Sequence, residues 1–266
     1  MKNVLVLVHD DAGQEARLQA ALDLTRVLDG HLVCLDVSIL YVAPGDYSGV
    51  GGGSLLIASE VESEDANRAR ILPRIESEGV AFNWIDVTDS LGEALRQTTA
   101  LADIVVLSSP LDTAYPDMKT AIGDVLLDSR KPVLAAPSAA RAFDPFGHAL
   151  VAWDGSPEAE TAIRAAMPLL QKATSVTLVE IDDGSLKTPA FEAASYLARY
   201  DVATNVRTIA GAHSKPATLL IDAAGTLKAD YIVMGGFGHS RFVEGLFGGV
   251  TDQMLRKCPV PLFLAH

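Results

Sequence analysis

Glycines gather in one stretch of the sequence at a spacing that could hold a phosphate group. Residues 235–251 follow directly on the apolar run 231–234 and read Gly-Gly-Phe-Gly-His-Ser-Arg-Phe-Val-Glu-Gly-Leu-Phe-Gly-Gly-Val-Thr. Glycine has no Cβ atom, so such a segment can adopt positive φ angles and bring backbone N–H groups close to a ligand. Residues 250–257 then carry an acidic residue near their start and two basic residues at their end, the charge order of a helix. Because the N–H groups at a helix start attract anions, this stretch predicts a phosphate site.

Several side chains in this glycine loop could contribute to such a site. Two amide-rich segments that converge on one point suit a diphosphate or triphosphate better than a single carboxylate. Thr251 could donate a hydroxyl or supply an oxygen to a bound metal, and His239, Ser240 or Arg241 could contact the outermost phosphate. Glycines also serve tight turns and close helix packing, and that structural interpretation of each glycine stays open.

A second polar group follows the apolar run 149–153. The chain continues as Asp154-Gly155-Ser156-Pro157, in which Ser156 is a suitable N-cap and Pro157 suits the first helical position. Asp154 has two interpretations of equal weight, because its carboxylate could close an Asx turn or contact a ligand at the end of a strand.

These residues need a scaffold, and the pattern of apolar runs indicates an α/β fold. Short, β-branched apolar runs alternate with segments of helical periodicity. Unbroken apolar strands of this kind suit a parallel sheet whose two faces are covered by helices. The expected strands are residues 4–8, 32–37, 82–87, 104–107 and 132–136 in the first half and residues 149–153, 175–181, 203–209, 231–234 and 261–265 in the second.

The two halves of the chain repeat one plan. Residues 102–107 read Ala-Asp-Ile-Val-Val-Leu, and residues 229–234 read Ala-Asp-Tyr-Ile-Val-Met. Between the halves, residues 137–147 carry two prolines, small residues and a terminal glycine, which is typical of a linker. We therefore expect two domains, residues 1–142 and 143–266.

The second half resembles the universal stress protein family. The pattern Gly-x2-Gly-x9-Gly, followed by a small residue and Val-Thr and preceded by Ile-Val-Met, is similar to the nucleotide loop of that family. Residues 150–156, Leu-Val-Ala-Trp-Asp-Gly-Ser, are similar to its first strand and the turn that follows. In the family the third glycine is usually followed by Ser or Thr, and Gly249 stands there instead. The substitution removes a hydroxyl and keeps the backbone N–H.

The resemblance implies a tandem, two-domain member with a specific fold. Each half is then a Rossmann-like, doubly wound α/β domain whose five-stranded, mostly parallel sheet has the order 3-2-1-4-5 with helices on both faces. Strands one and four flank the point at which the order reverses, where ligands collect beyond the carboxyl ends of the strands. Two-domain members resemble a fused homodimer, which would pair residues 132–136 with residues 261–265.

The resemblance also implies an adenine nucleotide as the ligand, ATP or else ADP or AMP, with Mg²⁺ as an optional companion. Asp154 then contacts the ribose hydroxyls, Ala152 and Met234 contact the adenine ring, and the backbone near Ile181 contacts its edge. The contacts to the phosphates fall on Gly235, Gly238, His239, Gly248, Gly249, Val250 and Thr251.

The first half lacks the residues of this site. Residues 107–111 read Leu-Ser-Ser-Pro-Leu, without a glycine, and Asp124 is expected near the helix start, where its charge would repel a phosphate. His9 or Asp10 could replace the ribose carboxylate, although we expect neither to bind nucleotide. Residues 45–54 are rich in glycine but lack the P-loop pattern, so a surface loop or lid is the favoured interpretation. The sequence thus predicts one competent site per chain, in the second half.

Composition narrows the range of partners. The 266 residues include 21 Lys and Arg against 34 Asp and Glu, a net charge of −13, which argues against nucleic acid or an anionic membrane as a partner. No stretch reaches the about 18 apolar residues of a membrane span, and the first apolar run is too short for a secretory signal. Cys34 and Cys258 have neither metal-ligand nor disulfide spacing and are expected to be buried as small apolar residues. We expect a cytoplasmic protein.

The leading functional hypothesis is a stress-response regulator or sensor that binds ATP or a related adenine nucleotide, with no enzymatic reaction assigned. One alternative is a slow ATPase or other nucleotide-dependent enzyme. Another is an interaction module that binds no ligand in either half. The expected assembly is an intramolecular pseudo-dimer with an unidentified protein partner, and a homodimer of whole chains is a further alternative.

Overall fold

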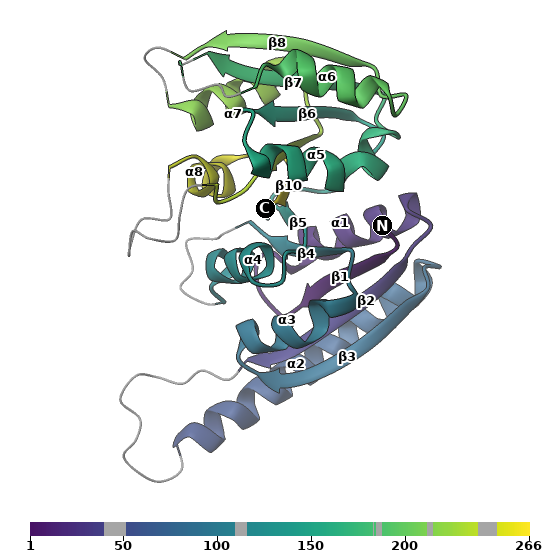
Figure 1. Ribbon diagram of the computed structural model, residues 1–266. Coiled ribbons are helices and arrows are strands. Elements are labelled where there is room, and N and C mark those ends of the chain that lie inside the picture. The colour runs from purple at the N-terminus through teal and green to yellow at the C-terminus, as the bar shows by residue number, and fades with distance from the viewer. Residues whose placement is uncertain (40–51, 110–115, 183, 185–187, 212–214, 239–248) are drawn as a thin grey trace.

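A computed structural model describes the chain except for residues 40–51, 110–115, 183, 185–187, 212–214 and 239–248, and it describes residues 52–59 by their backbone alone. One twisted sheet runs through the whole molecule, with helices on both of its faces (Figure 1). Its strands are β1 (Asn3–Val8), β2 (His31–Ile39), β3 (Phe82–Asp89), β4 (Ile104–Ser108), β5 (Val133–Ala136), β6 (His148–Trp153), β7 (Ser175–Asp182), β8 (Thr204–Ala210), β9 (Tyr231–Gly235) and β10 (Leu262–Ala265).

The order of the strands is that of two doubly wound halves placed back to back. The ten-stranded sheet runs β3-β2-β1-β4-β5-β10-β9-β6-β7-β8, so each half has the expected order 3-2-1-4-5. Strands within a half are parallel, whereas β5 and β10 pair antiparallel through Leu134 and Phe263 and their neighbours. The predicted contact between the two fifth strands is therefore confirmed. The two expected sheets are joined into one, with the C-terminal strand in its middle (Figure 1).

The helices divide between the two faces of the sheet. One core cluster contains side chains from α1 (Gln14–Val27), α2 (Gly52–Ser77), α5 (Pro157–Leu170) and α6 (Ala190–Ala198). The other contains side chains from α3 (Leu91–Thr98), α4 (Met118–Leu127), α7 (Pro216–Leu227) and α8 (Gly249–Lys257), and a short 3-10 helix η1 (Thr99–Leu101) follows α3. None of the helices in the described ranges is both long and apolar enough to cross a membrane.

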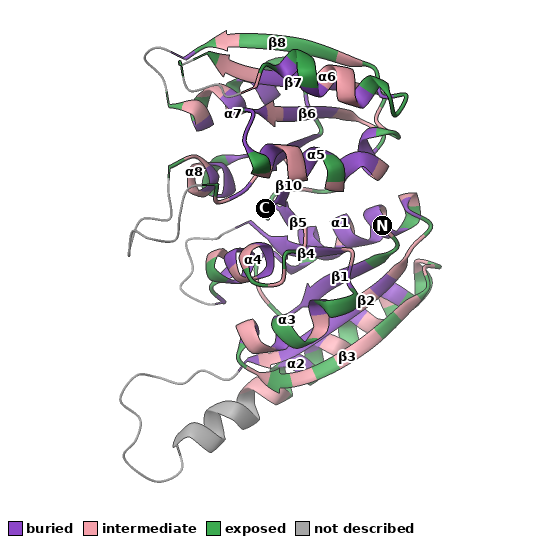
Figure 2. Ribbon diagram, viewed as in Figure 1, coloured by how far each residue is buried: buried purple, intermediate pink, exposed green. Residues whose placement is uncertain are grey.

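Burial explains why the central strands read as unbroken apolar runs. In β1, Val4, Val6 and Val8 face one core cluster, and Leu5 and Leu7 face the other. A strand that is covered on both sides gains apolar contacts at every residue, so the period-two alternation of a half-exposed strand is absent. The outermost strands, β3 and β8, have exposed residues along their length, as sheet edges do (Figure 2).

The segment between the two halves is bound to both of them. Phe143 is buried, its backbone N–H donates to Asp23 Oδ2 at 3.0 Å in the first half, and its ring meets that of Tyr231 edge-on, with 5.4 Å between centroids. The linker that composition predicts is therefore packed against both halves.

The structure describes the last three residues of the glycine-rich stretch 45–54. Residues 52–54 belong to helix α2. For these three residues, the interpretation as a loop is therefore wrong. Residues 45–51 lie outside the described part of the chain. Helix propensity is low for glycine, so the helix start could not be recognised from local sequence.

Candidate nucleotide site

The sheet order places the predicted site residues at one crossing point. In the second half the order reverses between β6 and β9, which are parallel neighbours through Val151 and Val233. Asp154 directly follows β6, and Gly235 is the last residue of β9. The carboxyl ends of parallel neighbouring strands lie at the same edge of a sheet, so these two residues share the position at which doubly wound proteins bind ligands.

Asp154 closes a turn and still faces solvent. Its Oδ1 accepts a hydrogen bond from the N–H of Ser156 at 2.9 Å, and Ser156 Oγ in turn accepts from the N–H of Ala159 at 3.2 Å, which caps α5. Gly155 has φ +71° and lies against the backbone of Thr188 so closely that a Cβ atom would be 2.3 Å from Thr188 N. The interpretation of Asp154 as an Asx-turn residue is therefore confirmed. Its carboxylate is also exposed, so it is accessible to a ligand.

The first glycine segment packs against the start of α5. A Cβ atom on Gly235 would lie 2.7 Å from Ala159 N, which no side chain tolerates, so at this position close packing by itself requires glycine. A Cβ atom on Gly238 would lie 3.1 Å from Glu158 Oε2. The N–H of Gly236 donates to Ala265 O at 2.9 Å, so this amide stabilises the sheet edge.

Thr251 ties this segment to the helix that follows the loop. The Thr251 side chain is buried, and its Oγ1 accepts a hydrogen bond from the N–H of Phe237 at 3.2 Å. The hydroxyl proton of Thr251 remains able to donate. The start of α8 and the end of β9 are thus held together, as convergence of the two glycine segments requires.

Gly249, the residue that departs from the family pattern, begins α8 with φ +44°, and no atom of the described residues lies within 4 Å of where its Cβ would be. The left-handed conformation favours glycine there on backbone grounds alone. The open space beside it would accept a ligand or a small side chain. The positive φ explains why a β-branched Thr does not fit this chain at that position.

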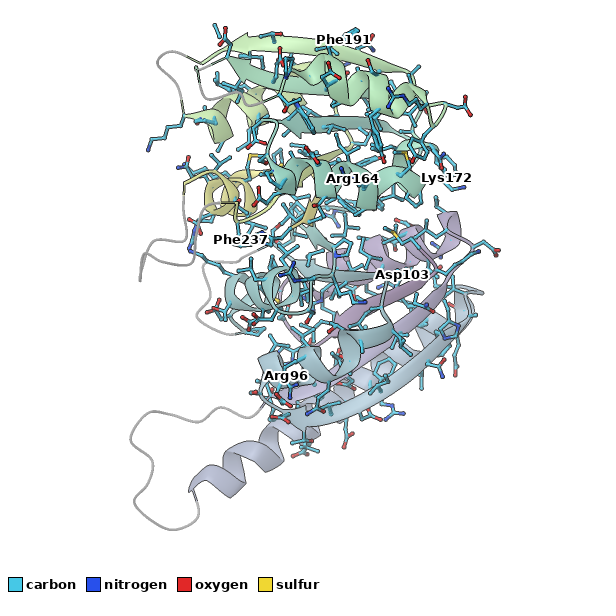
Figure 3. The ribbon with its side chains drawn as sticks, viewed as in Figure 1. Arg96, Asp103, Arg164, Lys172, Phe191 and Phe237 are labelled. Atoms are coloured by element: carbon cyan, nitrogen blue, oxygen red, sulfur yellow. The ribbon has the colours of Figure 1, made fainter. Side chains whose placement is uncertain are left out.

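The predicted adenine contacts lie on one side of the sheet. Met234 is buried in the core cluster formed with α7 and α8, and Ala152 and Ile181 pack against that cluster while partly exposed. Val250, a predicted phosphate contact, packs against the same cluster. Phe237 also packs against this cluster, at the boundary between the two halves (Figure 3). His239 and Gly248 lie outside the described residues, as do Ser240 and Arg241.

Charges around the site have both signs. The Asp252 carboxylate accepts from Lys119 Nζ at 2.7 Å, across the boundary between α8 and α4, and pairs with Arg256 at 3.2 Å on its own helix. Burial alone would raise the pKa of Asp252, but these two cations outweigh it and lower that pKa. Glu158 adds a negative charge beside Gly238.

The equivalent point in the first half is filled by a buried arginine. Arg17, which is 0% exposed, extends from α1 between the ends of β1 and β4, where its guanidinium donates to Ser108 Oγ at 2.6 Å and to His9 O at 3.2 Å. It also pairs with Asp11 at 2.9 Å, and its Nε donates to Leu7 O at 2.6 Å. Ser108 takes the place of Gly235 and hydrogen-bonds this arginine, so the first half closes its switch point with its own side chains.

Asp124 does not lie at the start of a helix, where it was expected to repel a phosphate. Helix α4 begins at Met118, one turn or more before the predicted start, so Asp124 lies in the middle of the helix. The carboxylate at the helix start is that of Asp117, which caps it by accepting from the N–H of Thr120 at 3.0 Å and from its hydroxyl at 2.7 Å. The prediction that Asp124 lies at this helix start is therefore wrong, because the alignment of the two halves by their strands did not fix where the helix begins.

Three residues around these sites escaped the sequence analysis. Glu158 could have been noted as a first-turn acidic residue, since it directly follows the predicted cap. Arg17 and Lys119 gave no signal, because their partners lie on other elements.

Comparisons with known proteins agree with this geometry. Residues 145–266 match the model of the universal stress protein family. A universal stress protein from Archaeoglobus fulgidus DSM 4304 superimposes with a TM-score of 0.73 at 17% identity, over 99% of this chain and 97% of that chain. A candidate universal stress protein from Pseudomonas aeruginosa UCBPP-PA14 gives 0.60 at 15% identity over 100% and 93%. A functionally unknown protein from Pseudomonas aeruginosa PAO1 gives 0.59 at 15% identity over 100% and 92%. No curated protein matches the sequence.

The fold and the position of the site define a tandem, doubly wound α/β protein whose switch point is accessible in one half and filled in the other. Its residues 145–266 belong to the universal stress protein family, and the first half repeats the same strand order.

Proposed function

We propose that this protein is a regulator or sensor of the stress response that binds one adenine nucleotide, ATP in the first instance, in its second half. The observation that carries the proposal is the junction of Thr251 with Phe237, which holds the start of α8 against the end of β9 at the switch point. A nucleotide there would place its ribose at the exposed Asp154 and its phosphates between the two glycine segments.

The residues present fit a polyphosphate accompanied by a cation. The described residues leave open space beside Gly249 at the start of α8, and Thr251 retains a hydroxyl proton to donate. Glu158 would repel a bare phosphate at Gly238, and a Mg²⁺ ion between the two would turn that repulsion into attraction. We therefore propose ATP with Mg²⁺ as the bound species.

The proposal includes one site per chain and a cytoplasmic location. Arg17 occupies the first half's switch point together with Asp11, so a nucleotide would have to displace a buried ion pair. Cys34 and Cys258 are buried and unpaired, which suits a reducing compartment.

The test compares two substitutions at Gly249. Asn and Asp have nearly the same shape, and both tolerate a positive φ angle better than other residues, so Gly249→Asn is the matched control for Gly249→Asp. Asp adds a negative charge where the phosphates are expected, which costs about 1 kcal/mol or more at 4 Å. Titration calorimetry should show ATP binding at least about fivefold weaker for Gly249→Asp than for Gly249→Asn.

Equal ATP affinities for the two variants would refute the proposed position of the phosphates. A wild-type chain that binds no ATP would favour the alternative of a pure interaction module. Turnover of ATP that is equal in wild-type and Gly249→Asp preparations would indicate a contaminant, whereas turnover lost in the Asp variant would favour a slow ATPase at this site.

A further inference from the structure

A group of acidic residues and a histidine lies in the first half, beside the switch point that Arg17 fills. His9, Glu60 and Glu64 each place one ligand atom within 4.8 Å of the others, and His9 Nδ1 lies 2.7 Å from Glu64 Oε1. This group does not belong to the nucleotide site, and its interpretation does not rest on nucleotide binding.

Two elements, β1 and α2, bring these side chains together. His9 directly follows β1, at the place that Asp154 holds after β6. Glu60 and Glu64 lie four residues apart on α2, which puts both on one face of that helix. Glu64 is fixed there, because its Oε1 accepts from the N–H of Asp10 at 3.2 Å and its Oε2 accepts from Asn67 at 3.1 Å.

His9 and Glu64 are buried and Glu60 is partly exposed, which separates the group from an ordinary acidic surface. His9 is 5% exposed and Glu64 is 3% exposed. Moving an ionised carboxylate out of water costs several kcal/mol unless a cation or a proton compensates it. A buried cluster with more carboxylates than cations therefore calls for a further positive charge.

A fourth carboxyl group supplies independent support. Asp36 on β2 is 5% exposed, and its Oδ1 has no hydrogen-bond partner within the described residues. Asp36 is the strand neighbour of Val8 and follows the even-numbered residues Leu32 and Cys34, which face the side of the sheet that α2 covers. Glu60 Oε1 is likewise buried and unpartnered.

The nearby arginines already pair with other acids. Arg17 pairs with Asp11, Arg70 with Asp10, and Arg68 with Asp86. Among the described side chains, the Glu64 carboxylate thus has the His9 imidazole as its charge partner.

We propose that His9, Glu60 and Glu64 bind a divalent transition-metal ion of the zinc class, with Asp36 accepting a hydrogen bond from a metal-bound water or completing the ligand set. One imidazole nitrogen and two or three carboxylate oxygens are ligands that Zn²⁺ accepts at about 2.0–2.2 Å. Small side-chain rotations bring atoms within 4.8 Å of one another to that distance from a common centre. The ion would link β1 to α2 and stabilise the first half, which makes this a structural metal site.

The test uses two glutamates of the same helix. Glu60→Gln removes one proposed ligand atom and keeps the shape of the side chain, and Glu62→Gln makes the same change at an exposed position two residues away. The full chain is first stripped with a chelator. Titration calorimetry with ZnCl₂ should then show one ion per chain for the wild type and Glu62→Gln, and binding at least about tenfold weaker for Glu60→Gln. His9→Gln, checked for folding by circular dichroism, should weaken binding in the same way.

Thermal unfolding gives a second readout. Zinc should raise the Tm of the wild type and of Glu62→Gln, because a ligand that binds only the folded state stabilises it. The same zinc concentration should leave the Tm of Glu60→Gln nearly unchanged. The proposal is overturned if the stripped wild type binds no zinc, or if Glu60→Gln and Glu62→Gln bind it equally.

Discussion

At the scale of single residues, Glu158 sets the charge that the proposed phosphate would meet at Gly238. Its carboxylate lies where an approaching phosphate would be repelled by about 1 kcal/mol in water. We predict that Glu158→Gln binds ATP about fivefold more tightly than the wild type in the absence of Mg²⁺, and that this gain shrinks or reverses when Mg²⁺ is added. Titration calorimetry with and without Mg²⁺ measures both effects.

Glu160→Gln is the control for that prediction, because Glu160 lies on the same helix and pairs with Arg164 at 2.9 Å. An equal change in ATP affinity for both variants would show that Glu158 acts only through the net charge of the chain. The proposed phosphate position at Gly238 would then be wrong.

Arg17 is the residue by which the first half differs most from the second. Removing one partner of a buried ion pair leaves the other charge uncompensated, which typically costs about 3–5 kcal/mol. We predict that Arg17→Met lowers the free energy of unfolding by that amount and leaves the number of bound nucleotides unchanged. Urea denaturation measures the first effect and calorimetry the second.

The comparison variant is Arg164→Met, which breaks an exposed pair on α5 and should cost about 0.5 kcal/mol or less. If Arg17→Met unfolds at the same urea concentration as Arg164→Met, the guanidinium does not contribute to the stability of the first half.

At the scale of elements, helices α4 and α8 meet through Lys119 and Asp252. The two side chains are 21% exposed each, so the pair contributes little more than an exposed one, about 0.5–1 kcal/mol. The pKa of Asp252 is lowered in the folded state, and a group of this kind stabilises the fold above its unfolded pKa of about 3.9. That contribution is lost as the pH falls through the folded pKa.

Lys119→Met should therefore be less stable than the wild type by about 0.5–1 kcal/mol at pH 6, and the difference should shrink as the pH falls towards 3. Urea denaturation over this pH range gives the comparison, with Lys172→Met at an exposed position as the control. A difference that stays constant down to pH 3 would mean that lost packing of the Lys119 chain, and not the charge of Asp252, is responsible.

The structural elements themselves followed from the sequence to a large extent. All ten strands lie within two residues of their predicted bounds, because strands buried on both faces leave apolar runs that stand out against the polar turns. The start of α4 and that of α2 were missed. Glycine at the start of α2 gives no helix signal, and the alignment of the two halves by their strands did not fix the start of α4.

The candidate site could be predicted from the sequence only where its residues lie close together in the chain. The spacing of the glycines and the turn at Asp154 depend on a few consecutive residues, and both are placed together by the sheet order. The contacts of Arg17 with Ser108 and of His9 with Glu64 join residues far apart in the sequence, so no local sequence pattern could predict them. Gly235 shows a further ambiguity, since its packing against α5 would require glycine with or without a ligand.

At the scale of the whole molecule, duplication has produced one sheet with two unequal halves. The antiparallel pairing of β5 with β10, the buried Phe143 and the ion pair between α4 and α8 make the halves a single unit. The first half closes its switch point with Arg17, and the second keeps Asp154 exposed at the same place. We therefore interpret the first half as a scaffold that positions α8, on which the proposed nucleotide site depends.

The most direct test of this asymmetry is native mass spectrometry of the full chain with ATP and Mg²⁺. We expect one adenine nucleotide per chain for the wild type, and the same number for Arg17→Met. Two nucleotides per wild-type chain, or none at saturating ATP, would contradict it.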